Sequence, residues 1–176
     1  MGTTTDSDLI AEARGGNTAA FEELLSSAIA PGARLAYGML QDRDAAEDAV
    51  QEAALKAWRR LGNVRPGAAF RPWFLGIVVN QVRSIRRTAW WSVLRLEGAP
   101  GLGTSAEIDP RGADFRRALL RVPPGQRAAI LLHFYLDLPL DEVASVLGIS
   151  VAGVKSRINR GLKRMRPALR GYEVLV

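Results

Sequence analysis

Residues 140–160 read Leu140-Asp-Glu-Val-Ala-Ser-Val-Leu-Gly-Ile-Ser-Val-Ala-Gly-Val-Lys-Ser-Arg-Ile-Asn-Arg160, and this stretch decides how the C-terminal part of the chain folds. It has the layout of a helix-turn-helix, in which two helices cross closely over a tight turn. Ala144 is small where the helices cross, Gly148 suits a left-handed backbone at the end of the first helix, and Ser150 can cap the second. Pro139 fits the start of the first helix.

The second helix of this motif has an apolar stripe and a basic, polar face. Helical spacing predicts burial of Val154, Ile158, Leu162 and Met165, and exposure of Ala152, Lys155, Ser156, Asn159, Arg160 and Lys163. An ordinary solvated helix surface usually mixes both signs of charge, whereas no acidic residue lies between Glu142 and Glu173. We therefore expect a DNA-binding helix. Its contacts with phosphate or base edges are predicted at Lys155, Ser156, Arg157, Asn159, Arg160, Lys163 and Arg164, with Arg166 also near phosphate.

The composition excludes several other classes of protein. With no cysteine and a single histidine, neither a disulfide framework nor a metal site is expected, and we expect no cofactor. The longest apolar stretch, around residues 128–136, is interrupted by His133 and is shorter than the roughly 18 residues that a membrane span needs. No signal peptide opens the chain, so we expect a cytoplasmic globular protein without membrane insertion.

The net charge of +6 is distributed unevenly along the chain. Residues 1–62 hold ten acidic and six basic residues, and residues 63–96 hold six arginines and no acidic residue. Residues 122–176 hold four acidic and eight basic residues. An acidic segment followed by two basic ones favours one surface for a protein partner and two for nucleic acid.

Helical periodicity recurs through the chain, and no stretch alternates like a half-buried strand, so the sequence predicts an all-α fold. We expect two small helical domains at residues 6–91 and 114–170, joined by a glycine-rich flexible linker at residues 92–113. In the first domain Asn17 can cap a helix, and Pro31-Gly32 predicts its end.

A helix predicted from Asp44 to Leu61 has two sharply different faces. The apolar face comprises Val50, Ala53, Ala54, Ala57, Trp58 and Leu61, and the polar face comprises Asp44, Glu47, Asp48, Gln51 and Glu52. Asp44 and Glu47 fit a capping box, so part of this charge can serve the helix start alone. Four acidic residues on one face also repel one another, which favours a positively charged or polar protein partner.

The next helix is predicted to bury Phe70, Trp73, Phe74, Ile77, Val78 and Ile85, with Pro72 near its first turn. Another of its faces is basic and polar and carries Asn80, Arg83, Ser84 and Arg87. Trp73 lies on the apolar stripe, which favours a core position over a stacking platform. The preceding loop, residues 62–69, holds small residues and Arg65. It suits either the admission of an unstacked base or a simple turn of the chain.

Together these segments resemble the extracytoplasmic-function sigma factors, the compact two-domain promoter-recognition subunits of bacterial RNA polymerase. Asp44-Ala-Ala-Glu-Asp-Ala-Val-Gln-Glu resembles the family's clamp-binding helix of region 2, and Phe70-Arg-Pro-Trp-Phe-Leu-Gly-Ile-Val-Val-Asn resembles its helix that reads the −10 element. Pro123-Pro-Gly-Gln-Arg through Arg166 resembles region 4. The resemblance covers nearly the whole chain, and the three motifs stand in the family's order.

The resemblance implies a role for each surface. The polar face with Glu47, Asp48 and Gln51 would dock on the β′ clamp helices of core RNA polymerase. The loop with Asn63 and Arg65, together with Asn80, would capture a flipped −10 base, and phosphate would be held by Arg83, Arg86 and Arg87. The region 4 helix would read the −35 element of promoter DNA. Contact with the β subunit and control by an anti-sigma factor are also implied, and the stretch after Arg170 is short for an added regulatory domain.

Two positions depart from the family's pattern. Gly153 stands where the family usually has threonine, which lowers helix propensity by about 1 kcal/mol and removes a hydroxyl. Pro139 stands where the family usually has serine or threonine. Both changes bear on the −35 sequence preference, and neither is expected to alter the fold.

Two other classes of function remain to be weighed. A transcription repressor or activator that is not a polymerase subunit can use the same helix-turn-helix, but no receiver domain or dimer interface is visible in the sequence. An enzyme would need a reactive group, and His133 in an apolar helix is typical of a core residue, with no nucleophile, metal cluster or phosphate loop beside it. The sequence therefore favours a sigma factor that is not an enzyme.

Overall fold

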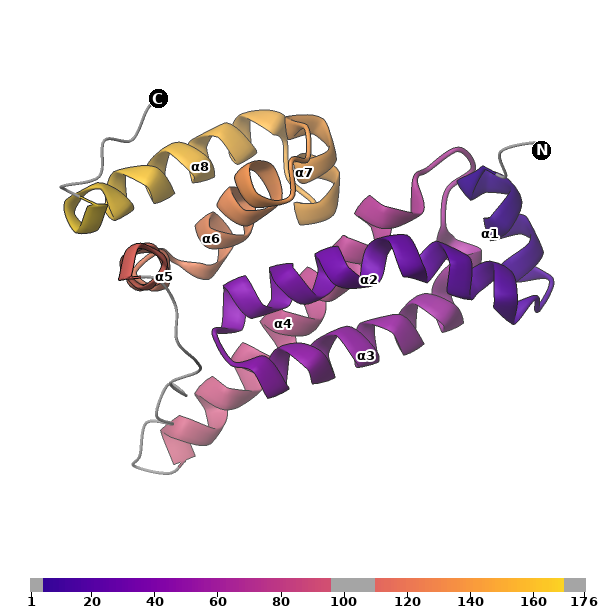
Figure 1. Ribbon diagram of the computed structural model, residues 1–176, viewed down its shortest axis with the longest axis horizontal. Helices are drawn as coiled ribbons and strands as arrows, with labels where there is room; N and C mark the ends of the chain where they lie inside the picture. The colour runs from indigo at the N-terminus through magenta and orange to yellow at the C-terminus, as the bar shows by residue number, and fades with distance from the viewer. Residues whose placement is uncertain (1–4, 96–109, 170–176) are drawn as a thin grey trace. The chain divides into compact units, whose positions relative to one another are not determined.

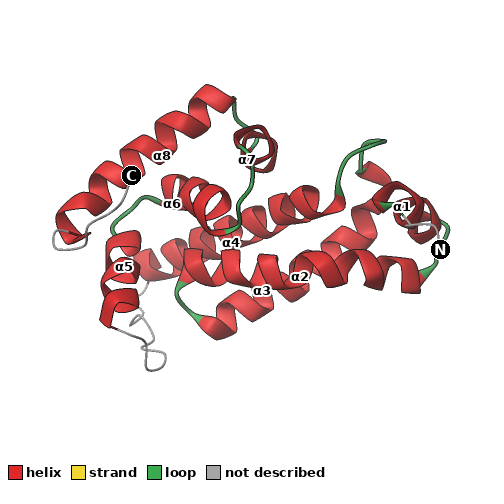
Figure 2. Cartoon of the chain, turned by 45° about the horizontal axis from the view of Figure 1, so that its top comes forward, coloured by secondary structure: helices red, strands yellow, loops and turns green. Residues whose placement is uncertain are grey.

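The computed structural model of the chain describes residues 5–95 and 110–169. The regular elements in these ranges are all helices (Figure 2), which confirms the predicted all-α class. They fall into two units, Met1–Leu102 and Gly103–Val176, and each unit is described by itself. The last helix of the first unit ends at Arg95 and the first helix of the second begins at Pro110, so both reach into the predicted linker range of residues 92–113.

The first unit is a small helical bundle. Its elements are α1 (Asp6–Arg14), α2 (Thr18–Leu40), α3 (Arg43–Arg60), the 3₁₀ turn η1 (Leu61–Asn63) and α4 (Phe70–Arg95). Figure 1 shows α2, α3 and α4 lying lengthwise beside one another, with α1 packed at one end of α2. The largest side chains fully buried between them are Leu24, Leu35, Met39, Phe70, Phe74, Leu75, Val78, Val79 and Val82.

Local caps fix the starts of the first two helices. The hydroxyl of Thr5 accepts a hydrogen bond from the amide of Asp8, whose carboxylate accepts in return from the hydroxyl and amide of Thr5. These bonds hold the pKa of Asp8 below its usual range. Asn17 caps α2 as predicted, since its Oδ1 accepts from the amides of Ala19 and Ala20 at 3.1 and 3.3 Å.

The prediction that α2 ends at Pro31-Gly32 is wrong, because the helix continues through both residues to Leu40. An internal proline costs a helix one hydrogen bond and about 3 kcal/mol. Pro31 and Gly32 are both buried, and α2 packs along α3 and α4, so tertiary packing offsets the local penalty. Gly32 is also where Phe74 of α4 comes close: a Cβ at residue 32 would lie 2.9 Å from its Cε1 atom.

We expect Gly32→Ala to destabilise the first unit by about 1–2 kcal/mol. Phe74 is fully buried and stacked on Phe70, with ring centroids 6.0 Å apart, so it has little room to move away from a new methyl group. This overpacking outweighs the gain of roughly 0.5–1 kcal/mol in helix propensity. Urea unfolding followed by circular dichroism measures the change. Gly62→Ala, whose Cβ would meet no atom within 4 Å, is the control, and a Gly32→Ala protein as stable as the wild type would contradict the expectation.

The buried faces of α3 and α4 differ in part from the predicted ones. On α3, Val50, Ala53 and Ala57 are buried as expected, as is Leu61 just beyond it. Ala54 is half-buried, and Trp58 is 36% exposed and packs edge-to-face with Phe21. On α4, Phe70, Phe74 and Val78 are buried, whereas Trp73, Ile77 and Ile85 are only half-buried. Leu75, Val79 and Val82 are buried instead, because α4 packs against both α2 and α3 and so needs a wider apolar stripe.

The second unit contains the predicted helix-turn-helix and the helices that support it. Its elements are α5 (Pro110–Leu120), α6 (Pro124–Ile130), the π-helical turn η2 (Leu131–Tyr135), α7 (Leu140–Leu147), α8 (Val151–Met165) and η3 (Arg166–Leu169). Arg127 is buried, and its Nη2 atom donates to the carbonyls of Leu120 and Val122 at 2.8 and 3.1 Å, which ties α6 to the end of α5. His133 is half-buried with its Nδ1 atom 2.9 Å from the carbonyl of Leu138, a structural position.

Candidate functional site

The turn between α7 and α8 has the geometry that the sequence predicts. Gly148 ends α7 with φ 64° and ψ 41°, and its amide donates to the carbonyl of Ser145 at 3.3 Å. The amide of Ile149 donates to the carbonyl of Ala144, a buried residue of α7. Ser150 then caps α8, because its Oγ accepts from the amide of Gly153 at 3.1 Å. These bonds fix the direction in which α8 leaves the turn.

The buried stripe of α8 includes Gly161 in place of Leu162. Val154, Ile158 and Met165 are buried as predicted, but Leu162 is 40% exposed. A Cβ at residue 161 would lie 2.6 Å from the Cδ1 atom of Ile130, so α8 crosses α6 directly over this glycine. A glycine has no side chain and so does not register in a hydrophobic pattern. The sequence therefore predicted burial of Leu162, the apolar neighbour of Gly161.

The opposite face of α8 is exposed and basic, as predicted. Its exposed residues are Ala152, Lys155, Ser156, Asn159, Arg160, Lys163 and Arg164, followed by Arg166. Arg160 donates from Nη2 to the hydroxyl of Ser156 at 2.8 Å and from Nε to its carbonyl at 3.3 Å. One guanidinium of the face is therefore held in a defined place one turn back along the helix.

Arg157 occupies a different place from the other predicted DNA contacts. It is half-buried, and a Cβ at Gly125 would lie 3.3 Å from its Nη1 atom. Its guanidinium therefore lies against the first turn of α6, at the margin of the exposed face. The structure thus brings together the outward residues of α8 and sets Arg157 beside them.

In the first unit, the loop between α3 and α4 is held by two residues that the sequence did not single out. Arg14 donates from Nε to the carbonyl of Leu61 at 3.2 Å and from Nη2 to the carbonyls of Gly62 and Val64. Asp6 accepts a hydrogen bond from the amide of Phe70 at 2.9 Å. Within the loop, Asn63 and Arg65 are exposed and Gly67 has φ 74°. No local pattern could reveal these anchors, because each joins residues far apart in the sequence.

The polar face of α4 extends away from this loop. Asn80 and Arg87 are exposed, and Arg83 donates to the Oδ1 atom of Asn80 at 3.4 Å. Arg86 instead donates to the carbonyl of Met39 near the end of α2, at 3.3 Å. Asn80 lies ten residues after the start of α4, about 15 Å along the helix axis. The loop and this face therefore form an extended track and not a single pocket.

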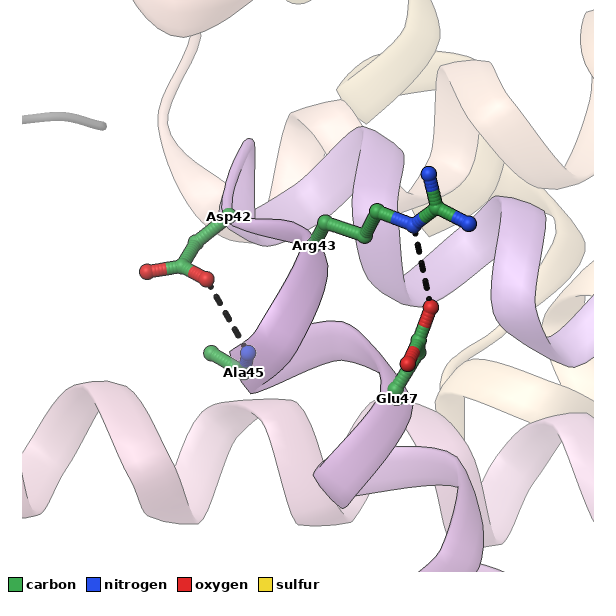
Figure 3. Close-up of polar contacts among 4 residues, drawn as sticks. All are labelled: Asp42, Arg43, Ala45 and Glu47. Carbon is green, nitrogen blue, oxygen red and sulfur yellow. Dashed lines mark hydrogen bonds and ion pairs between the residues drawn. The ribbon is translucent and has the colours of Figure 1, made fainter. Parts of the chain in front are cut away.

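The start of α3 differs from the predicted capping box (Figure 3). Asp42 is the N-cap, and its Oδ1 accepts from the amide of Ala45 at 3.0 Å. The helix thus begins at Arg43, and Asp44 lies inside it. Glu47 takes no part in a cap, because its carboxylate pairs with the Nε of Arg43 at 3.0 Å. The prediction that Asp44 and Glu47 form the cap is wrong.

The acidic face of α3 is less repulsive than the sequence interpretation assumed. Glu47 pairs with Arg43 and Glu52 with Lys56, in both cases one turn apart. Within residues 5–95 and 110–169, the side chains of Asp44, Asp48 and Gln51 form no hydrogen bond or ion pair, and all three are exposed. Leu55, 53% exposed, follows Gln51 by one turn. We call Asp44, Asp48, Gln51 and Leu55 the α3 strip.

A second exposed apolar feature lies on η2. Phe134 and Tyr135 are each 56% exposed, and the rings of Phe134 and His133 pack in an edge-to-face arrangement with centroids 4.8 Å apart. The wide π turn follows α6 directly, and π turns often occur at functional positions. The sequence did not single out this pair, because it lies inside the longest apolar stretch, where exposed and buried side chains look alike.

Comparison with known proteins shows to which family these surfaces belong. Residues 33–92 match the family Sigma-70 region 2, and residues 113–165 match Sigma-70, region 4. The ECF RNA polymerase sigma factor SigM of Mycobacterium tuberculosis is 32% identical over 170 residues, covering 96% of this chain and 86% of that protein. RNA polymerase sigma factor SigV of Bacillus subtilis is 32% identical over 134 residues, covering 76% and 81%. This chain belongs to the extracytoplasmic-function (ECF) sigma factors.

Solved structures agree with this assignment at the level of the fold. The ECF sigma factor matches CnrH, solved in complex with the cytosolic domain of CnrY, with a TM-score of 0.72 and 26% identity over 94% of this chain and 97% of that one. It matches the sigma factor RpoE, solved with the anti-sigma factor NepR from Bartonella quintana, with a TM-score of 0.77 and 24% identity over 86% and 97%.

The family also gives the general function. An ECF sigma factor directs transcription initiation by RNA polymerase and is not an enzyme, as the sequence predicted. The α3 strip, the loop and the polar face of α4 lie in the region 2 match, and the helix-turn-helix lies in the region 4 match. Helix α1 precedes both. Among the residues that the structure describes, no helix is both long and apolar enough to cross a membrane.

Proposed function

We propose that this ECF sigma factor reads two promoter elements with two different surfaces. The exposed face of α8 binds the −35 duplex, and the loop of residues 62–69 with the polar face of α4 binds the opened −10 strand. The corresponding functional domains are residues 6–91 and 114–170, with residues 92–113 as the linker. The observation that carries the proposal is the exposed face of α8, the second helix of a well-formed helix-turn-helix, which holds basic residues and no acidic one.

On the −35 side, the first turns of α8 reach the base edges. Lys155 and Arg160 can donate to guanine acceptors, and Ser156 and Asn159 lie on the same exposed face. The hydrogen bonds from Arg160 to Ser156 restrict the guanidinium before DNA binds. Lys163 and Arg164, further along the helix, contact phosphate. Arg157 lies against Gly125 of α6 and stabilises the edge of this surface.

On the −10 side, the loop and α4 form the track described above. Asn63, Arg65 and Asn80 meet bases that leave the duplex, since single strands expose edges that a duplex hides. Arg83 and Arg87 hold the backbone by charge. Arg86 contacts phosphate and also donates a hydrogen bond to the carbonyl of Met39. Its removal therefore also loosens the end of α2.

For polymerase binding, we assign the α3 strip to the β′ clamp helices of the core enzyme. Glu47 and Glu52 border the strip. They can leave their ion pairs with Arg43 and Lys56 and contact the polymerase at little energetic cost, because exposed ion pairs contribute only about 0–1 kcal/mol. Phe134 and Tyr135 present the kind of exposed aromatic surface that is enriched in protein interfaces, and we assign them to the β subunit. We also propose a cytoplasmic location and control by an anti-sigma factor, the kind of partner with which RpoE was solved.

We expect Lys155→Ala/Arg160→Ala to lower initiation from a promoter that depends on its −35 element by at least about 30-fold, the equivalent of roughly 2 kcal/mol for two lost contacts. Each lost base contact costs roughly 1–3 kcal/mol. Transcription in vitro with core RNA polymerase measures the effect, and promoters are first selected from a genomic library. Arg34→Ala, which removes an exposed cation from α2, serves as the control.

Two results would count against this assignment. If the double variant initiates at the wild-type level, α8 does not read the −35 element. Tight binding of the free protein to a duplex operator, with no initiation in the presence of core enzyme, would instead support the alternative of a repressor or activator that is not a polymerase subunit.

A further inference from the structure

Helix α1 holds one end of the loop that precedes α4. The guanidinium of Arg14 donates to the carbonyls of Leu61, Gly62 and Val64, which span the 3₁₀ turn where the loop begins. A planar guanidinium with several fixed donors is suited to binding successive carbonyls in one geometry. Arg14 therefore fixes the path of the backbone that leads into Asn63 and Arg65.

The same helix also holds the other end of the loop. The Oδ2 atom of Asp6 accepts from the amide of Phe70, the first residue of α4. The first amides of a helix have no partner within it, so Asp6 caps α4 from a distant part of the sequence. Its negative charge also lies where the helix dipole favours an anion.

Helix α1 is a firm support for both anchors. It buries Leu9, Ile10 and Ala13 in the first unit, and the Thr5–Asp8 capping box fixes its start. Asp6 and Arg14 are about 12 Å apart along its axis. The loop itself makes few backbone hydrogen bonds of its own in the described residues, namely Val64 to Leu61 and Ala68 to Arg65. Its conformation therefore depends on α1.

We propose that α1 positions the −10 loop before DNA binds, with Arg14 as the main positioning residue and Asp6 as the second. The inference rests on the function proposed above for residues 62–69. A loop already held in its bound conformation loses less entropy on capturing a base, and it discriminates better against a base that does not fit. Releasing the anchors should therefore impair both strand opening and −10 selectivity, while leaving the α3 strip and α8 intact.

The test uses holoenzyme assembled from core RNA polymerase and the full-length sigma factor. Strand opening is followed by the fluorescence of 2-aminopurine placed in the −10 element. Selectivity is the ratio of initiation at the best −10 sequence to initiation at single-base variants of it. We expect Arg14→Ala to slow opening about 10-fold and to lower the selectivity ratio about 3- to 10-fold. Its affinity for core enzyme should stay within 2-fold of the wild type.

Matched variants separate positioning from a general loss of structure. Arg14→Lys should retain only part of the selectivity, because one ammonium can donate to some of the three carbonyls but not to all of them in the same geometry. Asp6→Ala leaves Arg14 and its hydrogen bonds in place and should show the same two defects. Arg34→Ala, on the exposed surface of α2, should show neither. Wild-type opening and selectivity in both Asp6→Ala and Arg14→Lys, or defects of equal size in Arg34→Ala, overturn the proposal.

Variants of the loop itself distinguish the inference from the function on which it rests. If Asn63→Ala/Arg65→Ala impairs opening while the Arg14 and Asp6 variants do not, the loop reads the −10 element but α1 does not position it. If the loop variant changes neither opening nor selectivity, the role of the loop fails and the inference fails with it. Defects in both sets of variants support both.

Discussion

Replacing Asp44 and Asp48 together by lysine is expected to weaken binding of this sigma factor to core RNA polymerase by at least about 30-fold, roughly 2 kcal/mol. These exposed carboxylates of the α3 strip have no partner on their own helix, unlike Glu47 and Glu52. Close charge pairs across an interface have coupling energies of about 1.5 kcal/mol or more, and reversal turns attraction into repulsion. Fluorescence titration of labelled sigma factor with core enzyme measures the change.

Two controls separate docking from helix stability. Asp44→Asn/Asp48→Asn removes the charges without reversing them and should cause an intermediate loss, while Glu22→Lys/Glu23→Lys makes the same change in net charge on the exposed surface of α2. Asp44 lies in the first turn of α3, where a lysine loses about 0.3–1 kcal/mol of dipole interaction, so thermal unfolding is recorded for each variant. Core binding at the wild-type level, with only stability reduced, would make the acidic face structural.

Replacing Arg127 by alanine should destabilise the second unit by about 3–5 kcal/mol. The side chain is only 2% exposed, and its removal leaves the carbonyls of Leu120 and Val122 without their donor and opens a cavity between α5 and α6. Such a loss is a large part of the 5–15 kcal/mol that usually holds a domain folded. Hydrogen exchange should show faster exchange of the amides in α5–α8 and unchanged exchange in α1–α4.

The functional consequence should be equally selective. Core binding through the α3 strip should persist in Arg127→Ala, while initiation that depends on the −35 element should fall with the stability of α8. Arg121→Ala, an exposed arginine six residues earlier, is the matched control and should change stability by less than about 0.5 kcal/mol. Slow exchange of the α5–α8 amides in Arg127→Ala would show that the buried guanidinium contributes little.

Much of the fold could be predicted because periodicity and caps are local signals. The two faces of α8, the left-handed Gly148 and the caps at Asn17 and Ser150 all depend on residues within a few positions of one another. The continuation of α2 through Pro31 could not be read in this way, because the energy that offsets the proline comes from packing against α3 and α4.

The candidate site was predictable to a similar extent. Exposure of Lys155, Ser156, Asn159 and Arg160 follows from helical spacing alone. The position of Arg157 beside Gly125 and the burial of Gly161 both depend on how α6 packs against α8. Such information lies in the tertiary packing and not in the pattern of one helix.

The attachment of α1 to the loop has a consequence for building chimeric sigma factors. A natural cut for exchanging promoter specificity would be the region 2 match, residues 33–92, which leaves Asp6 and Arg14 behind in the donor. A transplanted loop would then meet a foreign α1 that need not reach its carbonyls. Grafts that begin before residue 5 would carry the loop together with its own support, and they should transfer specificity more completely.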